Sequence, residues 1–194
     1  MLITEYVSLS LLVLLLGTHL GVRPLFSRQR RLFFAATVFI MFAALAYQSR
    51  LLFFAWQKAE PPLNYLVPPY APLSYFLKTI WTRFFAGAII ALGIALLILL
   101  LIHLMGKERR ERIFEIDESI RIALSIFLLG QPNWIIYLLC GLILYVLLTA
   151  ISTLRSQRKI RVSFSPFWLP LAILIQGSIV LWGNPTILAV LRLS

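Results

Sequence analysis

The sequence predicts an all-α, polytopic transmembrane helical bundle, and three observations support that prediction. Of the 194 residues, 61% are hydrophobic and only 13% are charged, whereas a soluble domain is about half apolar and about a quarter charged. The apolar residues come in long blocks, and a membrane-spanning helix needs roughly 20 of them in succession. The net charge of +11 is concentrated in short runs between those blocks, as in the cytoplasmic loops of membrane proteins.

The first two predicted spans are Ile3 to Val22 and Leu32 to Gln57, with a basic loop from Arg23 to Arg31 between them. The segment 58–83 follows, with five prolines between Pro61 and Pro72. Because proline lacks an amide donor and disfavours helix in the residue before it, we expect a proline-rich interfacial loop there. Its tyrosines are typical of a membrane–water interface.

The third predicted span, Phe84 to Met105, contains small residues at four-residue intervals, and such a stripe favours close helix packing. The stripe consists of Gly87, Ala91 and Ala95. The fourth span, from Glu118 to Gly130, is short, and we expect Arg121 within it to snorkel or to face the bundle interior. The sequence GQPN then predicts a tight turn. The remaining spans are Trp134 to Leu154 and Phe164 to Leu191.

Charge predicts the orientation of these spans. The second and third basic loops are Lys107 to Arg112 and Arg155 to Arg161, and the positive-inside rule places such loops in the cytoplasm. With all three basic loops inside, the roughly six membrane segments alternate, and both termini lie outside. This single membrane-embedded domain covers residues 1–194, with Asp117 at the cytoplasmic membrane surface.

Several classes of partner and site are disfavoured by the same patterns. The basic runs form no continuous face, so we expect contacts with membrane lipid and not with nucleic acid. Cys140 is the one cysteine, which excludes an intrachain disulfide and a cysteine metal cluster. His19 and His103 lie at span ends without metal-ligand spacing. We therefore predict no metal and no cofactor.

The segment FEIDESIRIALSIFLLG, residues 114–130, contains the only aspartate of the chain, Asp117. One interpretation is structural, because an acid at the start of a helix pairs with free amide groups and with the positive end of the helix dipole. The other is that Asp117 is a catalytic carboxylate.

The second half of the chain resembles the C-terminal part of the type IV prepilin peptidases, which are membrane aspartic proteases of the G-x-G-D type. The stretches DESIRIALSIFLLGQPNW and RSQRKIRVSFSPFWLPLAILI resemble the segments around and after the G-x-G-D aspartate of that family. The resemblance aligns Asp117 with this aspartate. It places Gln48, in the sequence YQSR, where the family has its first catalytic aspartate. The positions that match the later landmarks are Phe127, Gly130, Pro132, Phe164, Pro166, Phe167, Trp182 and Gly183.

The departures from the family pattern concern the catalytic residues. Phe114 and Ile116 replace both glycines of G-x-G-D, and the zinc-binding region of the family has no counterpart. An aspartic protease needs two carboxylates that share one proton, and a chain with one aspartate cannot build an Asp–Asp pair. A glutamate could substitute, and the candidates are Glu5, Glu60, Glu115 and Glu118.

The sequence therefore leads to two functional hypotheses. The resemblance implies an integral protein of a bacterial inner membrane, catalytically degenerate, that binds the transmembrane helix of another protein, a prepilin-like one if the family function persists. If it cleaves, it is an aspartic endopeptidase that uses Asp117. The alternative is a non-enzymatic accessory or structural subunit of a larger membrane complex.

Overall fold

The computed structural model describes residues 3–21, 23–61, 63–105, 118–130, 132–156 and 167–182, and the regular structure of these residues is entirely helical. The all-α prediction is confirmed. Three helical segments of the described chain are long and apolar enough to cross a membrane, namely Gln29–Lys58, Leu73–Leu104 and Asn133–Ile151. Two further apolar helices are shorter, α1 (Ile3–Gly21) and α8 (Trp168–Trp182).

The helix α2 (Arg23–Lys58) corrects the prediction of a basic loop from Arg23 to Arg31, because this segment is helical on both sides of a kink at Gln29. Pro24 occupies the first turn, where its missing amide donor has no intrahelical partner to lose. Arginines at the end of an apolar helix can keep their charges in water, so they do not end the helix. The helix changes direction at Gln29, whose backbone angles are φ −113° and ψ 19°.

Only part of the segment 58–83 is the loop that its prolines predicted. A short 3-10 turn, η1 (Leu63–Leu66), is followed by the helix α3 (Leu73–Ile80). This helix continues through the π-helical turn η2 (Trp81–Phe85) into α4 (Ala86–Leu104), so the apolar helix begins well before Phe84. The reason is the position of Pro72, which precedes the first helical residue with an extended backbone and so starts the helix without interrupting it.

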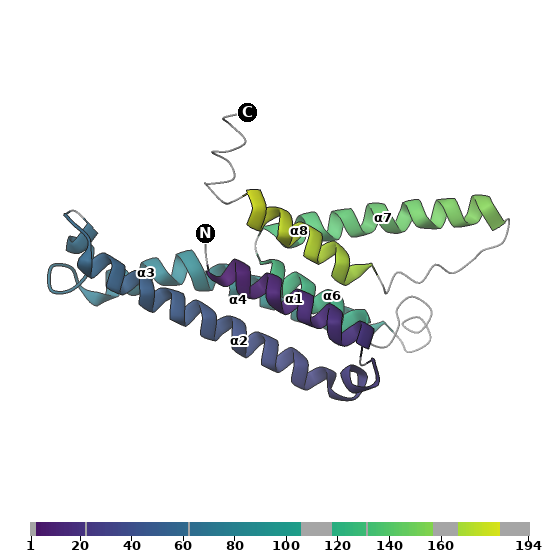
Figure 1. The fold of residues 1–194 in the computed structure, drawn as a ribbon, viewed down its shortest axis with the longest axis horizontal. Coiled ribbons are helices and arrows are strands. Elements are labelled where there is room, and N and C mark those ends of the chain that lie inside the picture. Colours follow the sequence, from purple (N-terminus) through teal and green to yellow (C-terminus); the bar gives the residue numbers. More distant parts are fainter. Residues whose placement is uncertain are drawn as a thin grey trace, which may run out of the picture.

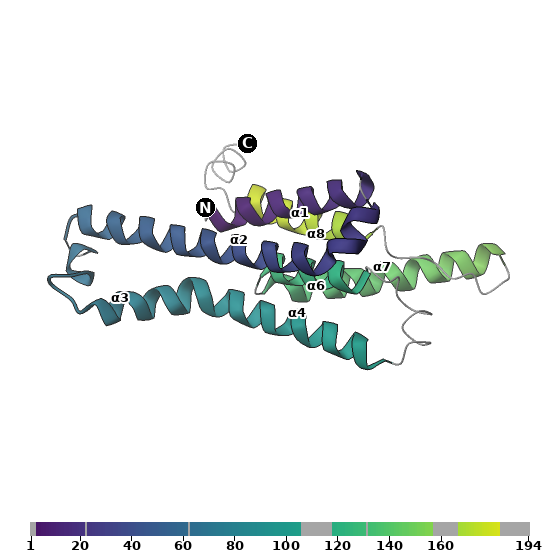
Figure 2. The ribbon, with the colours of Figure 1, turned by 90° about the horizontal axis from the view of Figure 1, so that it is seen from below.

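The helix α6 (Glu118–Leu129) lies at the centre of the bundle and contacts α1, α2, α4, α7 and α8 (Figures 1 and 2). Its 12 residues extend only about 18 Å, whereas the hydrocarbon core of a bilayer is about 30 Å thick. Every side chain from Arg121 to Leu129 is buried. The fourth predicted span is therefore too short to cross a membrane alone, and it serves as the core around which the longer helices pack.

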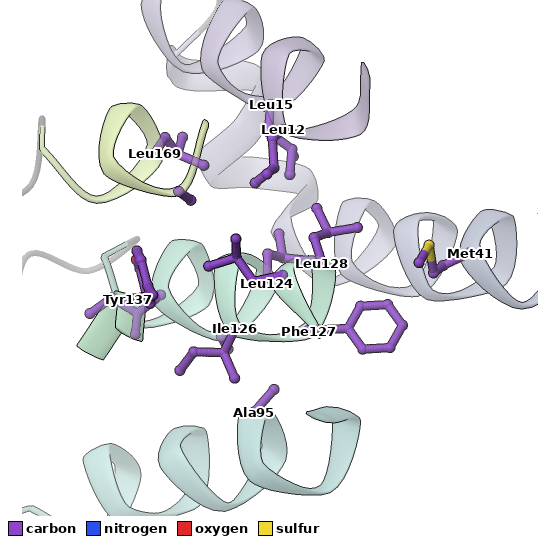
Figure 3. Close-up of a cluster of buried hydrophobic side chains, with 14 residues drawn as sticks. Leu12, Leu15, Met41, Ala95, Leu124, Ile126, Phe127, Leu128, Tyr137 and Leu169 are labelled. Atoms are coloured by element: carbon purple, nitrogen blue, oxygen red, sulfur yellow. The ribbon is translucent and has the colours of Figure 1, made fainter. Parts of the chain in front are cut away.

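The hydrophobic core is built on this short helix. Figure 3 shows Leu124, Ile126, Phe127 and Leu128 pointing from α6 toward different neighbours. The core side chains that the neighbouring helices contribute include Leu12, Leu15, Met41, Ala95, Tyr137 and Leu169. Among the described helices, α4 and α6 form the most extensive contact. Ala91 and Ala95 are fully buried, which confirms that the small-residue stripe packs helices closely.

The turn after α6 is tight, as GQPN predicted. Gly130 adopts φ +66°, a left-handed conformation that glycine adopts without steric cost, and α7 (Asn133–Ser156) begins three residues later. The Asn133 side chain donates to the Leu129 carbonyl at 3.2 Å and so caps the end of α6. Among the described helices, α7 packs mainly on α6 and α8, and it then extends beyond them (Figure 1). The sixth predicted span, Phe164 to Leu191, reaches past the described residues at both ends.

Candidate functional site

The first candidate site is a buried polar cluster at the start of α6. Glu118, Arg121 and Ser125 are 3%, 2% and 0% exposed. Their spacing of three and four residues places them on one face of the helix. A carboxylate and a guanidinium three residues apart on a helix attract each other, and buried ionisable groups in a membrane bundle are costly enough to suggest a function.

Trp168, at the start of α8, binds this cluster directly. Its indole Nε1 donates to Glu118 Oε1 at 2.6 Å, and its ring lies 5.7 Å from the ring of Tyr137 on α7. The Tyr137 hydroxyl is within electrostatic reach of both Glu118 and Arg121. Because these side chains come from α6, α7 and α8, the cluster connects all three helices.

A glycine on α7 makes room for this arrangement. A Cβ atom on Gly141 would lie 2.8 Å from Cζ3 of Trp168, which is closer than two carbon atoms can approach without displacement. The indole therefore fills the space where a larger residue would have a side chain. The cluster needs Gly141 as much as it needs the tryptophan.

The second candidate site is a cavity of about 180 Å³ at the other end of α6, beside Gly130. Its lining comes from α1, α2, α4, α7 and α8 as well as α6. We call it the polar cavity because six of its lining side chains are polar: Thr4, Glu5, Ser8, Arg83, Asn133 and Gln176. Binding pockets for drug-sized ligands have roughly 300–1,000 Å³, so this cavity is too small for an organic cofactor and accommodates side chains or water.

Hydrogen bonds hold α1 against this end of α6 and against α8. The Ser8 hydroxyl donates to the Leu128 carbonyl, and Gln176 Nε2 donates to the Glu5 carbonyl at 3.4 Å. The second polar atom of that amide, Gln176 Oε1, is buried and has no hydrogen-bond partner among the described residues. An acceptor left unpaired in a buried site costs roughly 1–3 kcal/mol. The polar cavity therefore holds an acceptor that a bound donor would satisfy.

The residues predicted as catalytic lie in different places. Asp117 falls outside the described residues. Gln48 is buried, and its Oε1 accepts from the Thr4 amide at 3.4 Å. Thr4 lines the polar cavity beside Gly130, so Gln48 lies near the end of α6. Glu118, the neighbour of Asp117, lies at the start of α6, and 11 residue steps of helix separate the two ends by about 16 Å.

The candidate glutamates are also dispersed. Glu5 lines the polar cavity and Glu118 lies at the opposite end of α6, whereas Glu60 is exposed in the connection after α2. Glu115 falls outside the described residues. None of the described carboxylates is placed to share a proton with another. The described residues also contain no group of three His, Cys, Asp or Glu side chains able to hold a metal ion.

Part of this geometry could be inferred from the sequence. Arg121 was expected either to snorkel or to face the bundle interior, and the structure shows it buried in the bundle. The hydrogen bond from Trp168 to Glu118 was missed, because a tryptophan near a span end is usually an interface anchor. The spacing of Glu118, Arg121 and Ser125 was the available signal for a buried polar face.

Comparison of the chain with protein-family models, curated proteins and solved structures finds no match. The resemblance to the prepilin peptidases therefore rests on the residues quoted above.

Proposed function

We propose that this protein is a degenerate prepilin peptidase core of a bacterial inner membrane that binds the transmembrane helix of another protein without cleaving it. The chief support is the buried, unpartnered Gln176 Oε1 in the polar cavity. An unsatisfied acceptor inside a membrane bundle favours a partner that brings a donor, either a polar side chain or an amide at a helix end.

The small-residue stripe supports a helix as that partner. Ala91 and Ala95 are already buried in the bundle. Gly87, the next residue of the stripe, lines the polar cavity instead, because α6 ends at Leu129 and leaves this part of α4 without a neighbouring α6 turn. A glycine at such a place lets another helix backbone approach closely. The stripe and the buried acceptor thus favour the same position for a partner helix.

The absence of cleavage is supported by the distribution of the carboxylates. Gln48 replaces the first aspartate of the family, and a neutral amide cannot accept the proton of an attacking water as a carboxylate does. Its Oε1 accepts from the Thr4 amide. Glu5 lines the polar cavity and Glu118 lies at the other end of α6. These two glutamates therefore do not form the pair of carboxylates that an aspartic protease requires.

The alternative, an accessory subunit of a larger complex, is favoured by α7. Among the described helices it packs mainly on α6 and α8, and much of its apolar surface is exposed. The exposed side chains include Leu139, Leu142, Ile143 and Val146. In this alternative a larger membrane partner packs along α7, and the polar cavity has no ligand.

Site-specific photo-crosslinking separates the two functions. The full chain is reconstituted with a synthetic prepilin-like transmembrane peptide, with a benzophenone amino acid at Gly87, at Val146 on α7, or at lipid-facing Leu97 as the matched control. Crosslinking at Gly87 only, reduced by Gln176→Leu, is the expected result. A peptide that crosslinks equally at Gly87 and Leu97 would contradict the proposed site. Preferential crosslinking at Val146 would favour the subunit hypothesis.

A cleavage assay with the same peptide tests the second half of the proposal. We expect no leader removal by the wild-type chain or by Asp117→Ala, as read by mass. Removal by the wild type that disappears in Asp117→Ala would show that the chain is an active protease.

A further inference from the structure

A further cavity, of about 490 Å³, lies between the start of α2, the end of α4 and the start of α6. We call it the basic cavity. Its cationic and hydrogen-bonding side chains are Arg30, Arg31, His103 and Ser119, and its apolar side chains are Phe34, Leu96, Leu99, Leu100, Ile102 and Ile120. This volume is within the range of small-molecule binding sites. None of the described lining residues is acidic.

The backbone of α2 places both arginines beside the basic cavity. The helix changes direction at Gln29, immediately before Arg30 and Arg31. Arg30 is half-buried and Arg31 is exposed, so one guanidinium lines the interior and the other remains near the opening. Guanidinium groups bind phosphate oxygens through two parallel hydrogen bonds. The opening of the cavity is therefore suited to a phosphate group.

The walls distinguish a lipid from a soluble anion. Leu96 and Leu100 line the cavity and are also about half exposed on the outer surface of α4, which joins the cavity to the side of the bundle that faces lipid. A free phosphate would gain nothing from these leucines. An acyl chain that follows them would gain the favourable free energy of removing its methylene groups from water.

We propose that the basic cavity is a binding site for one anionic phospholipid, with the headgroup phosphate on Arg30 and Arg31 and an acyl chain along Leu96 and Leu100. The site lies at the Glu118 end of α6, away from the polar cavity, and it does not depend on the proposed binding of a partner helix. A bound lipid would fill the space between α2, α4 and α6.

Native mass spectrometry of the full chain in detergent tests this proposal. The probes are a dioleoyl phosphatidylglycerol, a dioleoyl phosphatidylcholine and inorganic phosphate. We expect one tightly bound phosphatidylglycerol per chain, binding on the order of 10- to 30-fold weaker in the double variant Arg30→Gln/Arg31→Gln. The matched control is Lys58→Gln/Lys78→Gln, which removes the same charge from the other end of α2 and from α3, and it should bind as the wild type does.

A second variant keeps the charges and fills the cavity. Leu96→Trp should also reduce phosphatidylglycerol binding by at least tenfold. If the arginine variant is poorly folded, this second variant tests whether the lipid occupies the cavity. Equal losses in the arginine and lysine variants would show a non-specific charge effect and overturn the proposal. So would displacement of the lipid by millimolar inorganic phosphate, or phosphatidylcholine bound as tightly as phosphatidylglycerol.

Discussion

The two ends of α6 differ in chemistry although a single 12-residue helix joins them. At its start, Glu118 and Arg121 are buried and Trp168 completes the Glu118 contact, so the charged groups are engaged within the bundle. At its end, the polar cavity holds an amide oxygen of Gln176 without a partner among the described residues. The first end thus has its carboxylate bound within the bundle, although the Ser125 and Tyr137 hydroxyls also lack partners among the described residues, and the second end leaves its unpaired acceptor on a cavity.

Buried polar groups in a membrane bundle can thus have two roles. A network that is satisfied internally fixes the helices relative to one another. A group that remains unsatisfied lowers stability until a partner binds. Variants at the two ends should therefore affect different measurements, stability at the Glu118 end and partner binding at the Gly130 end.

The largest effect should come from removing Trp168. Trp168→Ala deletes the donor to Glu118 and the ring packed against Gly141 and Tyr137, so we expect a loss of about 3 kcal/mol in the free energy of unfolding. Denaturation by sodium dodecyl sulfate in mixed micelles measures it. Trp81→Ala, at an exposed tryptophan, is the control and should change stability by about 0.5 kcal/mol or less. Similar losses in both variants would mean that the cluster does not fix this end of α6.

A smaller effect, of about 1–3 kcal/mol, should follow from Gly141→Ala, because the new methyl group overlaps the Trp168 ring. Gly93→Ala is the matched control, since nothing lies within 4 Å of a Cβ atom at that helical glycine, and it should be neutral or stabilising by up to about 1 kcal/mol. Thermal unfolding in detergent compares the two variants. The double variant Gly141→Ala/Trp168→Phe should be less destabilised than the sum of its single changes, and simple additivity would contradict the predicted contact.

The smallest effect on stability should come from Gln176→Leu at the opposite end. This change loses the hydrogen bond to the Glu5 carbonyl but also removes the unpaired acceptor, so the free energy of unfolding should shift by about 1 kcal/mol or less in either direction. Photo-crosslinking of the transmembrane peptide at Gly87 should nevertheless decrease. A large loss of stability with unchanged crosslinking would show that Gln176 serves packing alone.

Much of the architecture could be predicted from the sequence because long apolar blocks have few alternatives to helix in a membrane. Blocks that begin at Ile3 and Trp134 indeed form α1 and α7 with ends close to the predicted ones. The boundaries were wrong where charge and proline were read as helix breakers. Arg23 to Arg31 are helical, and the helix that contains α4 begins at Leu73. Proline is compatible with a helix at its first turn, and arginines are compatible with the end of an apolar helix when their side chains can reach water.

The candidate sites were less predictable. Spacing on one helix places Glu118 and Arg121 on a common face, but it cannot show that Trp168, 50 residues later, donates to that carboxylate. Similarly, the sequence aligned Gln48 with a catalytic position, and only the packing of α1 reveals that its side chain accepts from Thr4. Contacts between helices depend on the angle at which the helices cross, and the hydrophobic periodicity of the sequence does not specify that angle.

The sequence by itself determined that the chain is a helical membrane protein with one aspartate and a basic character between its apolar blocks, because hydropathy and composition are sums over residues. Only the tertiary structure decided that α6 is the buried centre of the bundle, with Glu118 bound by Trp168 near its start and a Gln176 acceptor without a partner among the described residues near its end. The physical reason is that burial and hydrogen-bond pairing belong to pairs of side chains from different helices. They exist only once those helices have packed.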